Sequence, residues 1–223
     1  MKLRNVVFII AAIIIVDQAL KIWIKTNYHF GSVMNVMGLK WFQLYFIENE
    51  GMAWGWKFGG EWGKMILTLF RLGAVVFGTW YLIKIVKHKY NRGFIICAAL
   101  IYAGALGNLI DSMFYGLVFS ASDYATVATI FPHSSYAGFL HGRVVDMLYF
   151  PLIDSTFPKW MPFWGGENFI FFSPVFNIAD ASISTGVITL LIFQKRFFKK
   201  HHSDEANPLN ETNTKVNDEM QIS

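Results

Sequence analysis

The chain has 223 residues, of which 54% are hydrophobic and 15% are charged, whereas average soluble proteins carry about 25% charged residues. This composition excludes a largely disordered chain, and the single cysteine, Cys97, excludes a disulfide scaffold. The net charge of +4 does not indicate a nucleic-acid partner, because the basic residues stand in short clusters beside long apolar runs. We therefore expect an integral membrane protein.

Four apolar segments are long enough to cross a bilayer, which takes about 20 helical residues. The predicted spans cover about residues 6–24, 65–86, 94–110 and 175–193, within a single membrane domain over 1–203. Clusters of lysine and arginine precede the first span, separate the second from the third and follow the fourth. The positive-inside rule therefore predicts that both termini are cytoplasmic. Residues 204–223 are polar and are expected to form a disordered cytoplasmic tail.

The two larger connections then face outward, and they are rich in tryptophan. Indole rings favour the headgroup region, so we expect these loops to lie on the membrane, with a small folded domain over 115–170 as the alternative. Partial alternation over 40–47 predicts strand structure in the first loop. The predicted fold class is an all-α membrane protein of four transmembrane helices. It has a small β-containing outer loop between spans one and two, and an outer insertion at about 113–172.

Polar residues inside the spans share one depth. An ionisable side chain there costs about 2.5–3.5 kcal/mol on insertion scales, so each is expected to have a function or a partner. All of them fall in the outer third of the bilayer, which predicts a polar site that faces the outer leaflet. Asp17 and Lys21 stand at i,i+4 and are equally consistent with a purely structural ion pair. The set comprises Asp17, Lys21, Arg71, Asn108, Asp111, Asn177 and Asp180.

Carboxylates are the chemistry that remains, because the sequence contains no G-x-S-x-G, H-E-x-x-H or C-x-x-C motif. No metal or other cofactor is expected. Two carboxyl groups that share one proton can act as acid and base and activate water for peptide hydrolysis. Asp180 is one candidate, and its partner is Asp17, Asp111 or Asp146. These residues alone do not decide among the three.

Five motifs, in this order, resemble the lipoprotein signal peptidase (signal peptidase II) family of bacterial aspartyl proteases. Each motif is weakly specific, but five in order on a four-span topology are strongly specific. The resemblance covers about residues 6–196. The motifs are DQxxK at 17–21, NEGMAWG at 49–55, GALGNLID at 104–111, VVD at 144–146 and FNIAD at 176–180.

The resemblance implies that Asp146 and Asp180 are the catalytic dyad. It further implies that the enzyme removes the signal peptide from diacylglyceryl-modified prolipoproteins, cutting before the lipidated cysteine, in the bacterial inner membrane and next to membrane lipid. We expect a monomer, with Asp17, Lys21 and Asp111 as structural polar residues. The substrate-binding residues implied are Asn49, Gly51, Trp54, Asn108 and Asn177.

The chain departs from the family pattern at Ser112, where the family usually has an arginine that binds substrate backbone. Arg71 is at similar depth in span two and is our candidate for its replacement. Arg143 is the other candidate, and simple snorkelling of Arg71 to the headgroups is the alternative explanation. The segment 113–143 is also longer than the family pattern predicts.

Two other functions compete with proteolysis. A small proton-coupled transporter would use the intramembrane carboxylates as relay groups. It predicts polar residues along the inner halves of the spans as well, and these are absent. A non-enzymatic assembly factor would use the aromatic outer loops for docking, and it leaves Asp146 and Asp180 without a role.

Overall fold

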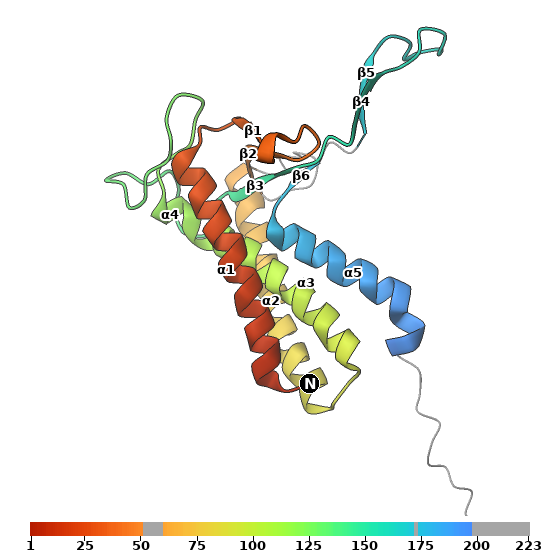
Figure 1. Cartoon of the computed structure of the whole chain (residues 1–223). Coiled ribbons are helices and arrows are strands. Elements are labelled where there is room, and N and C mark those ends of the chain that lie inside the picture. Colours follow the sequence, from red (N-terminus) through yellow and green to blue (C-terminus); the bar gives the residue numbers. More distant parts are fainter. Residues whose placement is uncertain (51–59, 172–173, 198–223) are drawn as a thin grey trace, which may run out of the picture.

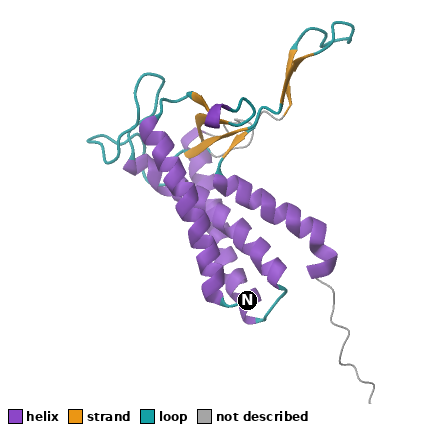
Figure 2. Ribbon diagram, in the orientation of Figure 1, coloured by secondary structure: helices purple, strands orange, loops and turns teal. Residues whose placement is uncertain are grey.

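The computed structural model describes residues 1–50, 60–171 and 174–197. Within these residues, four helices are long and apolar enough to cross a membrane, which confirms the four-span prediction. They lie side by side as a bundle (Figure 1), and Figure 2 shows that the strands gather at one end of it. The helices are α1 (Leu3–Asn27), α2 (Gly60–Lys87), α3 (Arg92–Ile110) and α5 (Ile178–Phe197).

All four helices differ by a few residues from the predicted bounds, and the differences in the third and fourth bear on the site. The third continues past residue 110 through a π-helical turn at Asp111–Tyr115 and the short helix α4 (Gly116–Val118). Such turns occur often at functional sites. The fourth begins at Ile178 rather than at 175, because Val175–Phe176 forms strand β6 instead. The predicted tail at 204–223 lies outside the described residues.

A small antiparallel sheet covers one end of the bundle. Its order is β1 (Val33–Asn35), β2 (Gln43–Asn49), β3 (Val144–Tyr149) and β6, with a 3₁₀ turn at Val36–Gly38 after β1. The strand expected at 40–47 is present as β2. The connection between spans three and four also contributes strands, so the two longer connections together build one sheet. An apolar cluster that includes Ile24, Phe46, Tyr115, Val145 and Met147 fixes this sheet to the ends of α1 and α3.

A second pair of strands, β4 (Ile153–Thr156) and β5 (Asn168–Phe171), forms a hairpin that extends away from the bundle (Figure 1). Its tip carries the exposed aromatic residues Trp160, Phe163 and Trp164. In the sequence, this hairpin lies between β3, which carries Asp146, and α5, which carries Asp180. Its two strands form a separate sheet and do not pair with the four-stranded one. That the outer loops lie on the membrane stays a prediction.

Small residues allow α3 and α5 to approach closely, as in many membrane helix pairs. A Cβ atom on Gly104 would stand 2.2 Å from the carbonyl oxygen of Ala179. A Cβ atom on Gly107 would stand 3.0 Å from Oδ2 of Asp17 and 3.3 Å from Cβ of Ala179. These glycines therefore bring α1, α3 and the start of α5 together at the level of the polar residues.

The close approach at Gly104 is testable. We expect Gly104→Ala to lower the free energy of unfolding by about 1–3 kcal/mol, because the added methyl overlaps the α5 backbone. Unfolding in mixed micelles measures this. Gly73→Ala is the matched control, since a Cβ there meets nothing within 4 Å. Equal stability of the two variants would contradict the packing described.

Candidate active site

Lys21 lies at the centre of the polar cluster, and its side chain is fully buried. Its ammonium nitrogen is 2.8 Å from Oδ2 of Asp17, 2.8 Å from Oδ2 of Asp111 and 3.0 Å from Oδ1 of Asn108. All three ammonium protons thus have acceptors. The Asp17–Lys21 pair is therefore part of a network that joins α1 to the end of α3.

Two residues that the sequence reasoning did not assign complete this network. Gln18 donates from Nε2 to Oδ1 of Asp111 at 2.8 Å, and its own Oε1 accepts from the hydroxyl of Tyr115 at 3.1 Å. The DQxxK motif contained the signal for Gln18, but nothing in the sequence indicates Tyr115. Oδ1 of Asp17 accepts from the backbone N–H of Ala179 at 2.8 Å, which ties α1 to the first turn of α5.

Asn177 caps the N-terminus of α5. Its Oδ1 accepts the backbone N–H of Asp180 at 2.8 Å, the usual geometry of an asparagine cap with its N3 residue. Asp180 therefore sits in the first helical turn, where the helix dipole favours a carboxylate. The local sequence FNIAD thus explains both the start of the helix and the place of the acid.

Two asparagine amides hold the two candidate catalytic carboxyl groups. Nδ2 of Asn108 donates to Oδ1 of Asp180 at 2.7 Å, and Nδ2 of Asn177 donates to Oδ1 of Asp146 at 2.7 Å. The amides also contact each other, with Nδ2 of Asn177 3.2 Å from Oδ1 of Asn108. The structure therefore brings these four predicted residues, from α3, β3 and α5, into one site.

Asp146 lies on β3, outside the membrane-spanning segments, and is only 4% exposed. Burial raises its pKa, and the nearby charge of Asp180 raises it further, to about 7. The charge of Lys21 and the hydrogen bond from Asn177 act in the opposite direction. Asp146 can therefore hold a proton near neutral pH, as one member of an acid–base pair must.

Arg71 contacts Ser112, the residue at which the sequence departs from the expected family pattern. Its Nη1 donates to Oγ of Ser112 at 2.9 Å, and that hydroxyl donates to the carbonyl oxygen of Asn108 at 2.9 Å. The carboxylate of Asp180 also interacts electrostatically with the guanidinium group of Arg71. Arg71 is thus beside the site, whereas Arg143 contacts Glu48 and the ring of Tyr136.

Asn49, another predicted binding residue, is the last residue of β2. Asn49 pairs with Val144, two residues before Asp146 in β3, so Asn49 and Asp146 point from the same face of the sheet. Gly51 and Trp54 lie outside the described residues. Among the residues described, no group of three His, Cys, Asp or Glu side chains could hold a metal ion.

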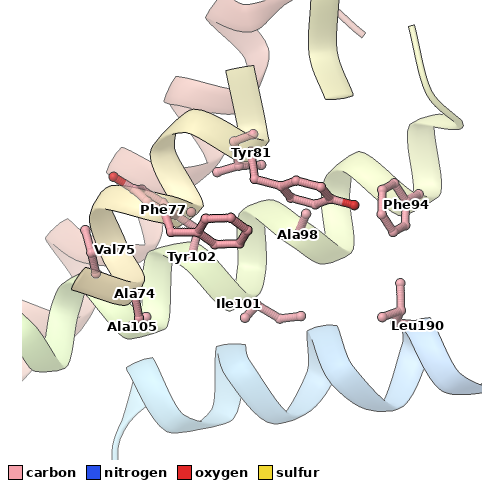
Figure 3. Close-up of a pocket in the computed structure, with 12 residues that line it drawn as sticks. Ala74, Val75, Phe77, Tyr81, Phe94, Ala98, Ile101, Tyr102, Ala105 and Leu190 are labelled. Carbon is pink, nitrogen blue, oxygen red and sulfur yellow. The ribbon is translucent and has the colours of Figure 1, made fainter. Parts of the chain in front are cut away.

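An apolar groove begins one helical turn from this site. It has a volume of about 490 Å³ and lies between α2 and α5 over the surface of α3 (Figure 3). Ala74 follows Arg71 by three residues and Ala105 precedes Asn108 by three, so the groove continues from the polar site along the helices. Its lining is almost wholly apolar, and it includes Phe77, Tyr102 and Leu190.

The fold and the site define a class: a four-span membrane enzyme with carboxyl groups held by amides at one end of its bundle. A family model for signal peptidase (SPase) II matches residues 9–196. The chain belongs to this family, and it is therefore a protease. The alternative of a transporter is not favoured.

Individual relatives agree with the family. A lipoprotein signal peptidase of Porphyromonas gingivalis is 48% identical over 195 residues, covering 86% of this chain and 84% of the relative. One of Amoebophilus asiaticus is 34% identical over 185 residues, covering 82% and 74%. The fold is similar to that of a bacterial membrane enzyme solved in meso at 2.3 Å, with a TM-score of 0.56 at 24% identity, covering 91% and 94%.

The electrostatics of the site predict how Asp146 titrates. We expect Asp180→Asn to lower the pKa of Asp146 below about 7, because it removes the negative charge that favours the protonated form. Infrared titration of the carboxyl band that disappears in Asp146→Asn measures this pKa. Asp123→Asn, at an exposed position, is the control. An unchanged pKa in Asp180→Asn would show that the two carboxyl groups do not interact.

Proposed function

We propose that this enzyme removes signal peptides from diacylglyceryl-modified prolipoproteins, cutting before the lipidated cysteine, with Asp146 and Asp180 as its catalytic dyad. The carrying observation is that Asn177 and Asn108 each hold one of these carboxyl groups at 2.7 Å, next to each other. The family and the names of the relatives support the substrate class.

The chemistry follows from one shared proton. Asp146 holds that proton and Asp180 acts as base, taking a proton from a water molecule as its oxygen attacks the scissile carbonyl carbon. Asp146 gives its proton to the carbonyl oxygen, and a tetrahedral diol forms. On collapse, Asp180 returns its proton to the leaving amine nitrogen and a diol hydroxyl returns its proton to Asp146. No metal or covalent intermediate is needed.

The residues around the dyad have different proposed roles. Asn108 and Asn177 orient the two carboxyl groups, while Asn49 binds the substrate backbone beside Asp146. Gly51 and Trp54 complete the cover of the substrate. Arg71 binds a substrate carbonyl oxygen in place of the arginine that the family has where this chain has Ser112.

The membrane arrangement is part of the proposal. Both termini lie in the cytoplasm, and the dyad faces the outer leaflet of the inner membrane, where the lipid-modified cysteine would sit. The apolar groove between α2 and α5 takes the hydrophobic segment of the signal peptide, because it leads directly from the polar site into the span. The enzyme acts as a monomer surrounded by membrane lipid.

The dyad is tested by single and double substitution. Asp146→Asn and Asp180→Asn are each expected to lower the cleavage rate of a purified diacylated prolipoprotein by about 10²–10⁴-fold. The double variant should be no slower than either single variant, because the two groups act as a unit. The exposed Glu167→Gln is the control. A single variant with near-normal turnover would remove that residue from the dyad.

Arg71 is tested by its effect on substrate affinity. Arg71→Leu removes a charged donor, so KM should rise by about tenfold or more. Arg71→Lys keeps the charge but loses the planar fork, and its effect should be smaller. Arg196→Leu, at the other end of the bundle, is the control. Normal KM and kcat in Arg71→Leu would show that Arg71 does not bind substrate.

A further inference from the structure

A second buried ion pair, separate from the Lys21 network, joins α1 to the sheet. Lys25 near the end of α1 contacts Oε1 of Glu48 on β2, and their side chains are 0% and 1% exposed. The hydroxyl of Ser122 lies 2.9 Å from the Lys25 ammonium nitrogen and donates to Oε1 of Glu48 at 2.8 Å. The pair therefore has a third partner, which comes from the insertion.

The insertion encloses this pair. The Lys25 ammonium nitrogen is 5.5 Å from the ring centroid of Phe119 and 5.1 Å from that of Tyr136, distances at which a cation and a ring attract. Nη1 of Arg143 lies 3.5 Å from Oε2 of Glu48, an oxygen that accepts no hydrogen bond from the described residues. Four residues between positions 119 and 143 thus contact this charge pair.

The position of Glu48 connects the pair to the dyad. In the antiparallel ladder, Ile47 opposes Asp146, Glu48 opposes Val145 and Asn49 opposes Val144. Successive side chains of a strand point to opposite faces. Glu48 therefore points to the insertion side, while Asn49 and Asp146 point to the site. The register shifts between Leu44 and Ile47, just before this segment, so the pairing of the end of β2 with β3 is offset from the pairing of its first residues.

Stability does not explain the pair. Taking two charges out of water has a large energetic cost, and replacing a buried pair with apolar side chains is often neutral or stabilising. A buried pair is better attested as a device that specifies one arrangement among several. Here the arrangement in question is how the end of β2 sits against β3.

We propose that the Lys25–Glu48 pair, with Ser122 and Arg143, is a positioning device for the reaction: it locks the end of β2 against β3 and so sets Asp146 and Asn49 for catalysis. This proposal rests on the proposed function of the dyad. Lys25 and Glu48 touch neither substrate nor reacting atoms. They act on the site through the backbones of β2 and β3. The insertion contributes through Ser122 and Arg143, which contact the pair.

The first test removes both charges together. In Lys25→Met/Glu48→Leu, we expect a melting temperature within a few degrees of the wild type, since no unpaired charge is left buried. We expect kcat to fall by about tenfold or more because Asp146 is misplaced, and KM to rise severalfold because Asn49 is displaced with it. A double variant with the melting temperature and the kcat of the wild type would overturn the proposal. Lys84→Met, at the other end of the bundle, is the control.

The second test guards against a double variant that fails to fold. Ser122→Ala removes one hydroxyl and no charge, and we expect kcat to fall severalfold while the melting temperature falls by only a few degrees, because the Lys25 ammonium group loses one acceptor but keeps Glu48. Ser122→Thr should retain kcat. Wild-type kcat in Ser122→Ala would overturn the proposal.

A third readout separates this inference from the proposed function. Displacement of β3 should shift the Asp146 pKa, because it changes the distances from Asp146 to the charge of Asp180 and to Nδ2 of Asn177, and infrared titration detects this shift without any substrate. If the wild type fails to cleave a diacylated prolipoprotein, the proposed function fails while this titration still tests the positioning. An unchanged Asp146 titration in Ser122→Ala together with unchanged kcat would exclude any coupling between the pair and the dyad.

Discussion

The buried ammonium group of Lys21 is the interaction on which the rest of the site depends. A charge at this depth must be compensated, and here three oxygen atoms from Asp17, Asp111 and Asn108 compensate it. Because Oδ1 of Asn108 faces Lys21, its Nδ2 must face Asp180. One cation on α1 thus decides the orientation of an amide on α3 and, through it, the place of an acid on α5.

The sheet has a different role: it places Asp146, which lies on a connection between two spans, close to Asp180, which lies on a helix. Asp146 belongs to a strand, and its position depends on β2, β6 and the apolar cluster beneath them. The two carboxyl groups therefore come from two kinds of support. Helix packing fixes one of them, and strand pairing between the two longer connections fixes the other. The asparagine amides join the two supports across a short distance.

Hydropathy and depth predicted the spans and the clustering of their polar residues, because membrane insertion imposes both on the sequence. Composition could not choose the partner of Asp180, since that choice depends on contacts between residues far apart in the chain; the family resemblance favoured Asp146. Strand β6 was assigned to a span because two apolar residues beside a helix have no distinguishing period. Nothing in the sequence indicated the role of Lys25, because a lysine at the end of a span ordinarily reaches the headgroups, and its partner Glu48 lies on strand β2, 23 residues further along the chain.

The double duty of Asn177 has a consequence for how this enzyme fails. The same side chain starts α5 through its oxygen and holds Asp146 through its nitrogen. Fraying of the first turn of α5 would therefore also break the hydrogen bond from Asn177 to Asp146, well before the helix bundle unfolds. Loss of activity on heating should then track hydrogen exchange at the amides of Asp180 and Ala181, a local opening, rather than global unfolding. The time for which the enzyme stays active on heating therefore depends on the stability of the first turn of α5.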